Sequence, residues 1–550
     1  MTQKISQEHI LDTLKGLVAC ESVSCTEKEV TAEQFVYDFL KNIPYFQKHP
    51  DQFGLYKIPD DPFGRMIPYA VVLGKKKDTV ILSGHTDVVN TEVYGEAEPL
   101  AYTLGDELEQ KLASMALNDV QRADMESGEW IWGRGAADMK GGVTLNMCLT
   151  EMYADLADKG ELEGSIFFDA VPDEESYSAG MRAILPVLLE TKEKYDLDFK
   201  LLICPEPAAE EGPKQVLSLG SAGKVMPVFL TQGVLAHAGH VYNGISALNM
   251  LANLYQKTAG SLDFVDTYDG ESTMPPCWLN MRDTKDLYDV SLPYRAYGVM
   301  SLLSFDTTLE QFLAKLKKLA EQAFTEEVTK LNDQYQEFKK NNRFERKEKI
   351  DYPTCVYTVE ELQSKLRAED AAKFDAFFKK IYDQAADMIS AGKSFPDATV
   401  YMMNQLLDYA DIKNPVILIG VAPPYYPATH SDMLEGKKGF GTKVYEHLKK
   451  ISEEQYGQEL TYENYFTGIS DNSYTSVPDI DFDSLVKNYP MWGRIYDLDF
   501  DAIRGVNVPS ILYGPIGREY HQWTERVNKH SLLEVMPAMM QEAVEFAWKE

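Results

Sequence analysis

The sequence is poor in cysteine, and the cysteines it has are spread along the chain. Six occur in 550 residues, and no two of them form a Cys-x-x-Cys pair. They are Cys20, Cys25, Cys148, Cys204, Cys277 and Cys355. A disulfide-stapled fold or a thiolate zinc site normally needs clustered or regularly spaced cysteines. The sequence therefore argues against both, and we expect a reduced, cytoplasmic location.

Long apolar runs and positive charge are also scarce. No stretch is apolar over the roughly 20 residues that a membrane helix needs. The first segment, "MTQKISQEHILDTLKGLV", is typical of an amphipathic helix and lacks the apolar region of a signal peptide. Lys and Arg number 54 against 86 Asp and Glu, a formal net charge of -32. Because such a charge repels nucleic acids and anionic lipids, we expect neither a nucleic acid nor a membrane as partner.

The order of apolar segments indicates two domains. From about residue 10 to 220, strand-like segments such as "DTVILSG" and "FKLLICPEP" alternate with amphipathic helices, which indicates a largely parallel sheet. A different pattern begins near Ser221, and the strand–helix alternation resumes later. We therefore expect an α/β domain with a mostly parallel central sheet, made of residues 1–222 and 423–550. An inserted α+β domain would occupy residues 223–422.

The inserted part contains two long amphipathic stretches between about residues 308 and 390. In the first, Leu309, Phe312, Leu313 and Leu316 begin a series with helical spacing. The second runs from about residue 359 to 390. Their apolar stripes predict helices that pack within this domain or across a dimer.

Polar residues follow the apolar strands. In "GHTDVV", His85 and Asp87 come after a buried strand and should point to the same face. Taken alone, they are more often a hydrogen-bonded pair in a turn. In "WGRGAADMKGG", Asp138 lies in a glycine-rich turn before a helix, where an acidic residue can also serve as a cap.

Further carboxylates and a second histidine follow later strands. "DAVPDEESYSAG" contains Glu174 and Glu175, "LICPEP" contains Glu206, and "YGPIGREYHQWTERV" contains His521. A solvated acidic turn is the alternative for the first motif, but clustered carboxylates persist most readily around a cation. The carboxyl ends of parallel strands meet at one edge of a sheet, so we expect these side chains to meet. Imidazole and carboxylate ligands suit zinc, with cobalt or manganese possible, and this number of carboxylates favours two ions that share one of them.

In this order, "GHTDVV", "GRGAADMKGG", "DEE", "EP" and a late "GP" with His521 resemble the di-zinc peptidase family. That family includes aminoacylase, glutamate carboxypeptidase and succinyl-diaminopimelate desuccinylase. The resemblance covers nearly the whole chain. The length, the extended insert and "APPYYP" are most similar to the arginine-utilisation (RocB) branch. The resemblance implies a zinc-peptidase-like catalytic domain, with the inserted domain as a lid that also mediates a homodimer.

The resemblance also implies roles for the metal residues. Asp138 would bridge two divalent ions, most readily zinc. His85 and Glu206 would complete the ligands of the first ion. Glu175 and His521 would complete those of the second.

Four further residues match family positions that bind no metal. Glu174 would be the general base, and Asp87 would orient the ring of His85. His237 in "LAHAGH" matches a lid histidine that steadies the oxyanion, either in its own subunit or across the dimer. Asp471 in "GISDNSY" matches a position near the site, with a structural role.

The expected activity is hydrolysis of an amide or peptide bond in a small peptide or N-acyl amino acid, with a substrate in arginine or ornithine metabolism. Arg295 and Arg518 are candidates for binding a substrate carboxylate. The alternative is a non-catalytic or regulatory homologue that keeps the fold and the metals. A general base that binds no metal, as Glu174 is expected to be, favours the enzyme, because a silent scaffold has no need of one.

Overall fold

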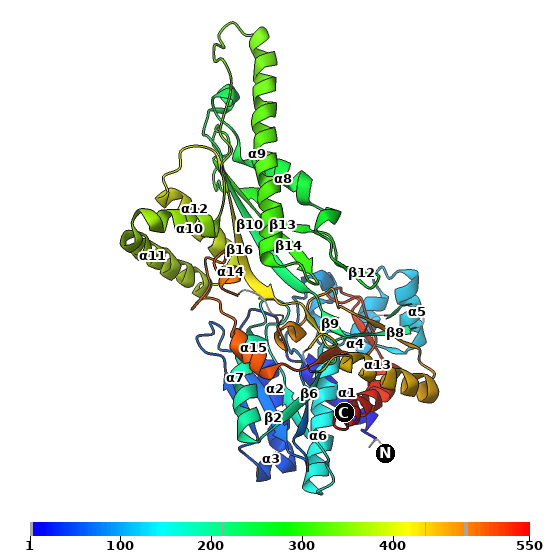
Figure 1. Ribbon diagram of the computed structural model, residues 1–550. Helices are drawn as coiled ribbons and strands as arrows, with labels where there is room; N and C mark the ends of the chain where they lie inside the picture. The colour runs from blue at the N-terminus through cyan, green and yellow to red at the C-terminus, as the bar shows by residue number, and fades with distance from the viewer. Residues whose placement is uncertain (1–3, 209, 212–213, 435, 478–481) are drawn as a thin grey trace. The chain divides into compact units, whose positions relative to one another are not determined.

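The computed structural model describes residues 4–208, 210–211, 214–434, 436–477 and 482–550 (Figure 1). The chain forms two compact units. Unit 1 comprises Met1–Ser221, Pro427–Pro478 and Asp499–Glu550, and unit 2 comprises Ala222–Tyr426 and Asp479–Leu498. Unit 2 thus contains a late segment of the chain in addition to the continuous insert.

Unit 1 is built on a nine-stranded sheet, in which β7 pairs with β8 beside the main path β1-β2-β5-β3-β6-β19-β8-β18. The strands are β1 (Phe53–Lys57), β2 (Met66–Val72), β3 (Asp78–Leu82), β5 (Ser165–Asp169), β6 (Asp198–Cys204), β7 (Glu210–Glu211), β8 (Lys214–Ser218), β18 (Leu460–Glu463) and β19 (Ser510–Leu512). The central strands β5, β3, β6 and β19 are parallel. Every residue of β5 is buried, as expected for a parallel strand covered on both faces. The predicted α/β class with a mostly parallel central sheet is confirmed.

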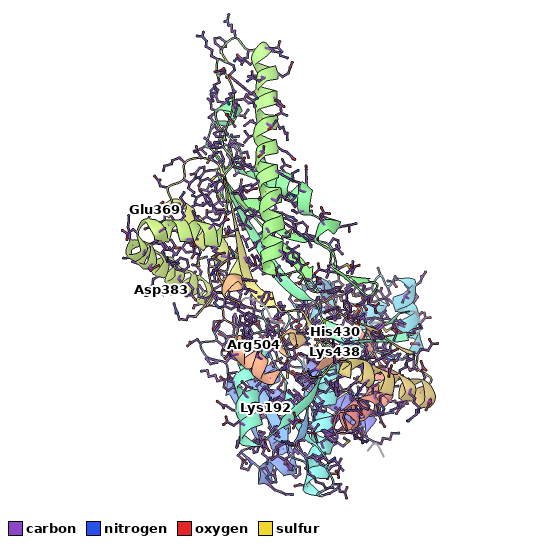
Figure 2. All side chains as sticks on the ribbon, viewed as in Figure 1. Lys192, Glu369, Asp383, His430, Lys438 and Arg504 are labelled. Carbon is purple, nitrogen blue, oxygen red and sulfur yellow. The ribbon has the colours of Figure 1, made fainter. Side chains whose placement is uncertain are left out.

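Helices pack against this sheet. The main ones are α1 (Gln7–Val18), α2 (Glu29–Asn42), α3 (Pro44–Lys48), α6 (Lys140–Asp158), α7 (Ala179–Lys194), α13 (Phe440–Ile451), α15 (Phe500–Val506) and α16 (Met536–Ala547). Helix α6 contacts β2 and β5, and α16 contacts β3 and β6. Helices α7 and α15 pack together, and Lys192 of α7 donates to the carbonyl of Gly505 at 2.9 Å (Figure 2).

The start of α6 lies very close to the turn after β6. A Cβ on Gly142 would lie 2.1 Å from the carbonyl oxygen of Pro205. Any larger residue at this position would push the turn away. The glycine therefore lets the segment after Asp138 approach the segment that carries Glu206.

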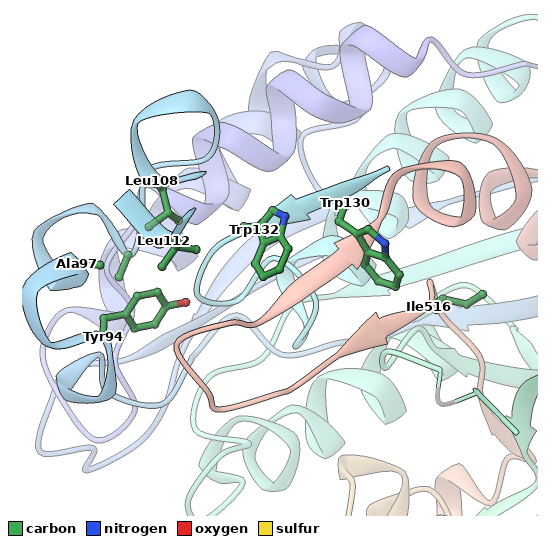
Figure 3. Packing of buried hydrophobic residues seen from close by; sticks show 8 residues of the cluster. Tyr94, Ala97, Leu108, Leu112, Trp130, Trp132 and Ile516 are labelled. Carbon is green, nitrogen blue, oxygen red and sulfur yellow. The ribbon is translucent and has the colours of Figure 1, made fainter. Parts of the chain in front are cut away.

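A subdomain that the sequence did not predict lies between β3 and β4. It contains η1 (Glu92–Leu100), α4 (Asp106–Ala113) and α5 (Asp119–Ser127), and β4 (Trp130–Trp132) follows it. Strand β4 pairs with β21 (Arg526–Asn528), which pairs with β20 (Gly517–Arg518). Figure 3 shows the buried cluster that joins these elements: Tyr94, Ala97, Ala101, Leu108, Leu112, Trp130, Trp132 and Ile516. The cluster includes both tryptophans of β4, the partner strand of β21, and Ile516, which directly precedes β20.

Unit 2 contains a five-stranded sheet in the order β13-β14-β10-β16-β15. Its strands are β10 (Gly223–Gln232), β13 (Cys277–Asp283), β14 (Arg295–Ser304), β15 (Val356–Thr358) and β16 (Val416–Tyr426). Its longer helices are α8 (Ala247–Thr258), α9 (Leu309–Lys340), α10 (Val359–Glu369), α11 (Ala371–Ser390) and α12 (Phe395–Tyr409). Helix α8 contacts β10 and β14, and α12 contacts β10 and β16. The second predicted amphipathic stretch is two helices, because Asp370 interrupts it and its carboxylate accepts a hydrogen bond from the Lys373 N–H at 3.0 Å.

Among the described residues, no helix combines the length and the apolar character that a membrane span requires.

Candidate metal centre

His85 lies directly beyond β3, where the parallel pairing with the β5 segment continues. It pairs with Val171, whose carbonyl accepts a hydrogen bond from the Thr86 N–H at 2.9 Å. The side chain of His85 is 1% exposed. Its Nδ1 lies 3.1 Å from the carbonyl oxygen of Asp87 and 3.5 Å from Asp87 Oδ1. This side of the ring is therefore held by Asp87, and Nε2 faces the other way.

Three carboxylates face Nε2 of His85. Asp138 Oδ1 lies at 3.2 Å, Glu206 Oε1 at 3.6 Å and Glu174 Oε2 at 3.9 Å. They come from three different segments of unit 1, after β4, after β6 and after β5. The ends of these segments converge at one point, although β4 belongs to a separate three-stranded sheet.

The carboxylate of Asp138 lies between two imidazoles. Its Oδ1 faces His85, and its Oδ2 lies 3.3 Å from His521 Nε2. The same nitrogen of His521 lies 3.0 Å from Glu175 Oε2. Ligand atoms of His85, Asp138 and Glu175 all lie within 4.8 Å of one another. The arrangement is two donor sets that share one carboxylate, and such a set of oxygen and imidazole donors fits divalent metal ions.

The electrostatics of the cluster show how many acidic groups it concentrates. Burial and neighbouring carboxylates raise the pKa of Glu206 to about 8 and that of Glu174 well above its ordinary value. Hydrogen bonds that His521 donates to the carboxylates of Asp138 and Glu175 raise its pKa to about 10. Burial alone would lower the pKa of His85, but Glu206 and Asp138 outweigh it and raise that pKa. A divalent cation would relieve the same repulsion between buried carboxylates.

Asp87 contacts more than the histidine. Its Oδ1 accepts a hydrogen bond from the Glu174 N–H at 3.0 Å, and its Oδ2 accepts one from the Glu175 N–H at 3.1 Å. Oδ2 also accepts from Ser24 Oγ at 2.5 Å. Although burial opposes it, these bonds and His85 lower the pKa of Asp87. One ionised carboxylate thus orients His85 and the turn that carries both glutamates.

Asp173 belongs to the same acidic motif but points into the protein. Its Oδ1 lies 2.7 Å from Arg65 Nη1, and its Oδ2 accepts from the Ala179 N–H at 3.0 Å. It has a φ of 72°, a left-handed conformation that aspartate tolerates better than most residues. Asp173 therefore shapes the turn, while Glu174 and Glu175 face the centre.

His237 and Arg295 lie in unit 2. His237 is exposed and precedes η2 (Ala238–Asn243), where its Nδ1 accepts a hydrogen bond from the Gly239 N–H at 2.9 Å. Its contact with the centre stays a prediction. Arg295 is buried and lies 2.7 Å from both Gln232 Oε1 and Asp408 Oδ1. It already has partners within its own unit.

Arg518 and Asp471 lie in unit 1. Arg518 pairs with Asp124 at 2.8 Å and with Glu210 at 2.7 Å, and it stacks on Trp130. A substrate carboxylate would have to compete with these two. Asp471 is buried in η5 (Asp471–Tyr474), and its burial raises its pKa to about 7. The substrate-binding role predicted for Arg518 stays untested.

Two charged residues beside the centre, Arg134 and Glu525, were not predicted from the sequence. They form an ion pair of 2.5 Å, and both side chains are 1% exposed. The only signal in the sequence is a charged residue within a tight or apolar motif, "WGRG" and "TERV". A signal of that kind does not identify the partner.

The parallel sheet and the shared-carboxylate centre define the class of protein. Residues 81–488 match the sequence model described as Peptidase family M20/M25/M40, and the chain belongs to this family. The resemblance inferred from the motifs is thereby confirmed.

Two relatives from Bacillus subtilis are similar to the chain over nearly its whole length. The chain is 32% identical over 542 residues to "Uncharacterized protein YqjN" of Bacillus subtilis, which covers 97% of this chain and 95% of that protein. It is 26% identical over 535 residues to "Protein RocB" of the same organism, covering 96% and 93%.

Solved structures support the fold. A tripeptidase from Staphylococcus aureus superposes with a TM-score of 0.53 at 13% identity, covering all of both chains. An M20 family metallo-carboxypeptidase from Sulfolobus solfataricus gives a TM-score of 0.52 at 12% identity, covering 98% of this chain and 99% of that one.

Proposed function

We propose that this protein is a metal-dependent hydrolase that cleaves an amide or peptide bond in a small peptide or N-acyl amino acid. The observation that carries the proposal is the Asp138 carboxylate, which directs one oxygen to His85 and the other to His521. This geometry is suited to a carboxylate that bridges two ions. Zinc suits the donors best, and cobalt or manganese are alternatives.

The residues of the cluster divide into two ligand sets. His85 and Glu206 would hold one ion together with Asp138. Glu175 and His521 would hold the other, again with Asp138. Bound there, the ions would supply Lewis-acid activation of the scissile carbonyl and of a water molecule.

Glu174 is the proposed general base. It lies at the edge of the cluster, 3.9 Å from His85 Nε2, and its backbone is fixed by Asp87. Its carboxylate would accept a proton from the attacking water and deliver it to the leaving amine. A protein that only bound metal would have no use for a carboxylate placed in this way, which favours the enzyme over a regulatory homologue.

His237 is the proposed donor to the oxyanion. Its exposed ring and its position before η2 leave it accessible to a substrate. Such a donor is effective because it acts where charge develops in the transition state. The ring would donate to a substrate either in its own subunit or in the partner subunit of a dimer.

A homodimer through unit 2 is also part of the proposal. Strand β13 is at the edge of the five-stranded sheet and its side chains are mostly exposed, with Leu279 55% exposed. An edge strand with free backbone groups and an exposed apolar side chain is a template for pairing with a second chain. A second copy of this chain would pair there.

The proposed substrate class rests on a resemblance alone. The chain is similar to RocB, and the motifs resemble the arginine-utilisation branch, so arginine and ornithine derivatives are the first compounds to test.

The test is hydrolysis by metal-free protein that has been reloaded with zinc, cobalt or manganese. The panel comprises dipeptides and N-acyl amino acids, including N-acyl arginine and N-acyl ornithine. We expect amine release that requires metal and stops on chelation. Protein that binds metal yet cleaves nothing on the panel would favour the regulatory alternative.

A further inference from the structure

The buried ion pair between Arg134 and Glu525 joins two parts of the candidate centre. Arg134 Nη1 lies 2.5 Å from Glu525 Oε2, and the residues are 391 positions apart. A buried ion pair stabilises a protein only when its remaining polar atoms are also satisfied. Arg134 Nε has no hydrogen-bond partner among the described residues, and the partners of the other atoms show what the pair does.

The second carboxylate oxygen of Glu525, Oε1, faces the segment that carries Asp138. Glu525 Oε1 accepts hydrogen bonds from the N–H groups of Ala137 and Asp138, both at 3.2 Å. The carbonyl of Glu525 accepts a third bond, from the Gly133 N–H at 3.1 Å. Glu525 therefore fixes the backbone from which the Asp138 carboxylate extends.

The second terminal nitrogen of Arg134, Nη2, faces the segment that carries His521. Arg134 Nη2 donates to the carbonyl oxygen of His521 at 3.0 Å and to that of Asn90 at 3.3 Å. His521 has a φ of 63°, a left-handed conformation that is uncommon for residues other than glycine. Its ring is 53% exposed, so packing does little to direct it. Besides the contacts of its Nε2 with Asp138 and Glu175, the bond from Arg134 to its carbonyl holds His521 in place.

We propose that Arg134 and Glu525 are positioning residues that set the spacing between Asp138 and His521. This pair would thereby determine the geometry of the ion that those two residues hold with Glu175. The inference rests on the proposed metal centre, and it assigns no contact with substrate or metal to either residue. The planar guanidinium of Arg134 is essential to this positioning, because a lysine could not reach Glu525 and the carbonyl oxygens of His521 and Asn90 together.

A matched control lies next to the pair. Arg526 is as buried as Arg134, pairs with Glu519 at 2.5 Å and with Asp124 at 2.7 Å, and stacks on Trp132. Its hydrogen bonds go to these carboxylates and to the carbonyl of Thr524, rather than to the backbone of a proposed metal ligand. Replacing Arg526 by lysine removes an equally buried guanidinium but leaves the Arg134–Glu525 ion pair and its hydrogen bonds in place.

The experiment is a titration of metal-free protein with Co²⁺, followed by calorimetry and by the visible absorption of bound cobalt. The wild type, Arg134→Lys, Glu525→Gln and Arg526→Lys are compared, and the melting temperature of each metal-free form reports stability. We expect Arg134→Lys and Glu525→Gln to weaken one of the two sites about 10- to 100-fold and to change its absorption, as loss of a residue supporting a metal ligand does. The other site shares only Asp138 with it, so its affinity should fall less. Arg526→Lys should keep both sites even if its melting temperature falls.

Two results would overturn the inference. In one, Arg134→Lys and Glu525→Gln bind both ions with wild-type affinity and absorption. In the other, all three variants lose affinity in proportion to their loss of melting temperature, which would make the pair merely structural. If Arg134→Lys does not fold, Glu525→Gln, which has almost the same shape as the wild type, gives the same decision. Wild-type protein that binds no cobalt would instead overturn the metal centre itself.

Discussion

Asp87→Asn is the substitution that most selectively tests how the centre is held. The carboxylate of Asp87 is fully buried and accepts hydrogen bonds from the backbone of Glu174, the backbone of Glu175 and Ser24 Oγ. Asparagine has almost the same shape but replaces one acceptor oxygen by an NH₂ group. That group would face a donor, so at least one bond to the glutamate turn is lost.

The size of the effect can be worked from these contacts. A hydrogen bond to a charged group contributes about 1.5–3 kcal/mol. Residues that support metal ligands usually change metal affinity about 10- to 100-fold when replaced, which corresponds to roughly 1.4–2.7 kcal/mol. The two ranges agree for the loss of one such bond. We therefore expect Asp87→Asn to weaken metal binding by about 10- to 100-fold.

Calorimetric titration of metal-free protein with zinc measures this directly. Ser24→Ala is the matched control, because it removes a bond to the same carboxylate without touching His85 or the glutamate turn. It should bind zinc almost as the wild type does. Wild-type affinity in Asp87→Asn, or an equal loss in Ser24→Ala, would refute the reasoning.

Three further predictions concern other parts of the chain. His237→Ala should lower kcat about 10²- to 10³-fold while the metal content stays unchanged, as loss of an oxyanion donor does; an unaltered kcat would remove His237 from the mechanism. Burial raises the pKa of Glu33 from its ordinary 4.5 to about 8. Between these values the folded protein binds a proton that the unfolded chain releases, so the stability of the fold decreases as the pH rises through this window. Between pH 5 and pH 8, a window that lies about between these two pKa values, the melting temperature of Glu33→Gln should thus fall less than that of the wild type. Parallel curves of melting temperature against pH would contradict this. Leu279→Lys should convert the proposed dimer to a monomer in sedimentation, because a charge on an edge strand opposes pairing, and an unchanged dimer would show that β13 is not the interface.

Much of the candidate centre could be predicted because its chemistry follows the sheet. His85, Glu174 and Glu206 each come shortly after an apolar strand, and parallel strands end at one edge. Strand order therefore brings these residues together without any knowledge of loops. The distances between them agree with that reasoning.

The contacts around the centre could not be predicted in the same way. Arg134 and Glu525 are 391 positions apart, and nothing local tells which of 86 acidic residues an arginine will meet. Arg518 is a candidate in the sequence for binding a substrate carboxylate, yet Asp124 of α5, a helix that the sequence did not predict, pairs with it. The break at Asp370 was missed because hydrophobic spacing continues across it, while a side-chain cap ends one helix and begins the next.

The most direct test of the proposed hydrolase is Glu174→Gln, measured for metal content and amide hydrolysis in the same preparation. Glutamine keeps the shape of Glu174 and cannot accept the proton, whereas the neighbouring Glu175→Gln should lose metal because Glu175 is a proposed ligand. We expect Glu174→Gln to keep two ions per chain, the stoichiometry of a two-metal site, while hydrolysis falls about 10²- to 10⁴-fold. A metal-loaded Glu174→Gln protein that hydrolyses substrate at the wild-type rate would contradict it.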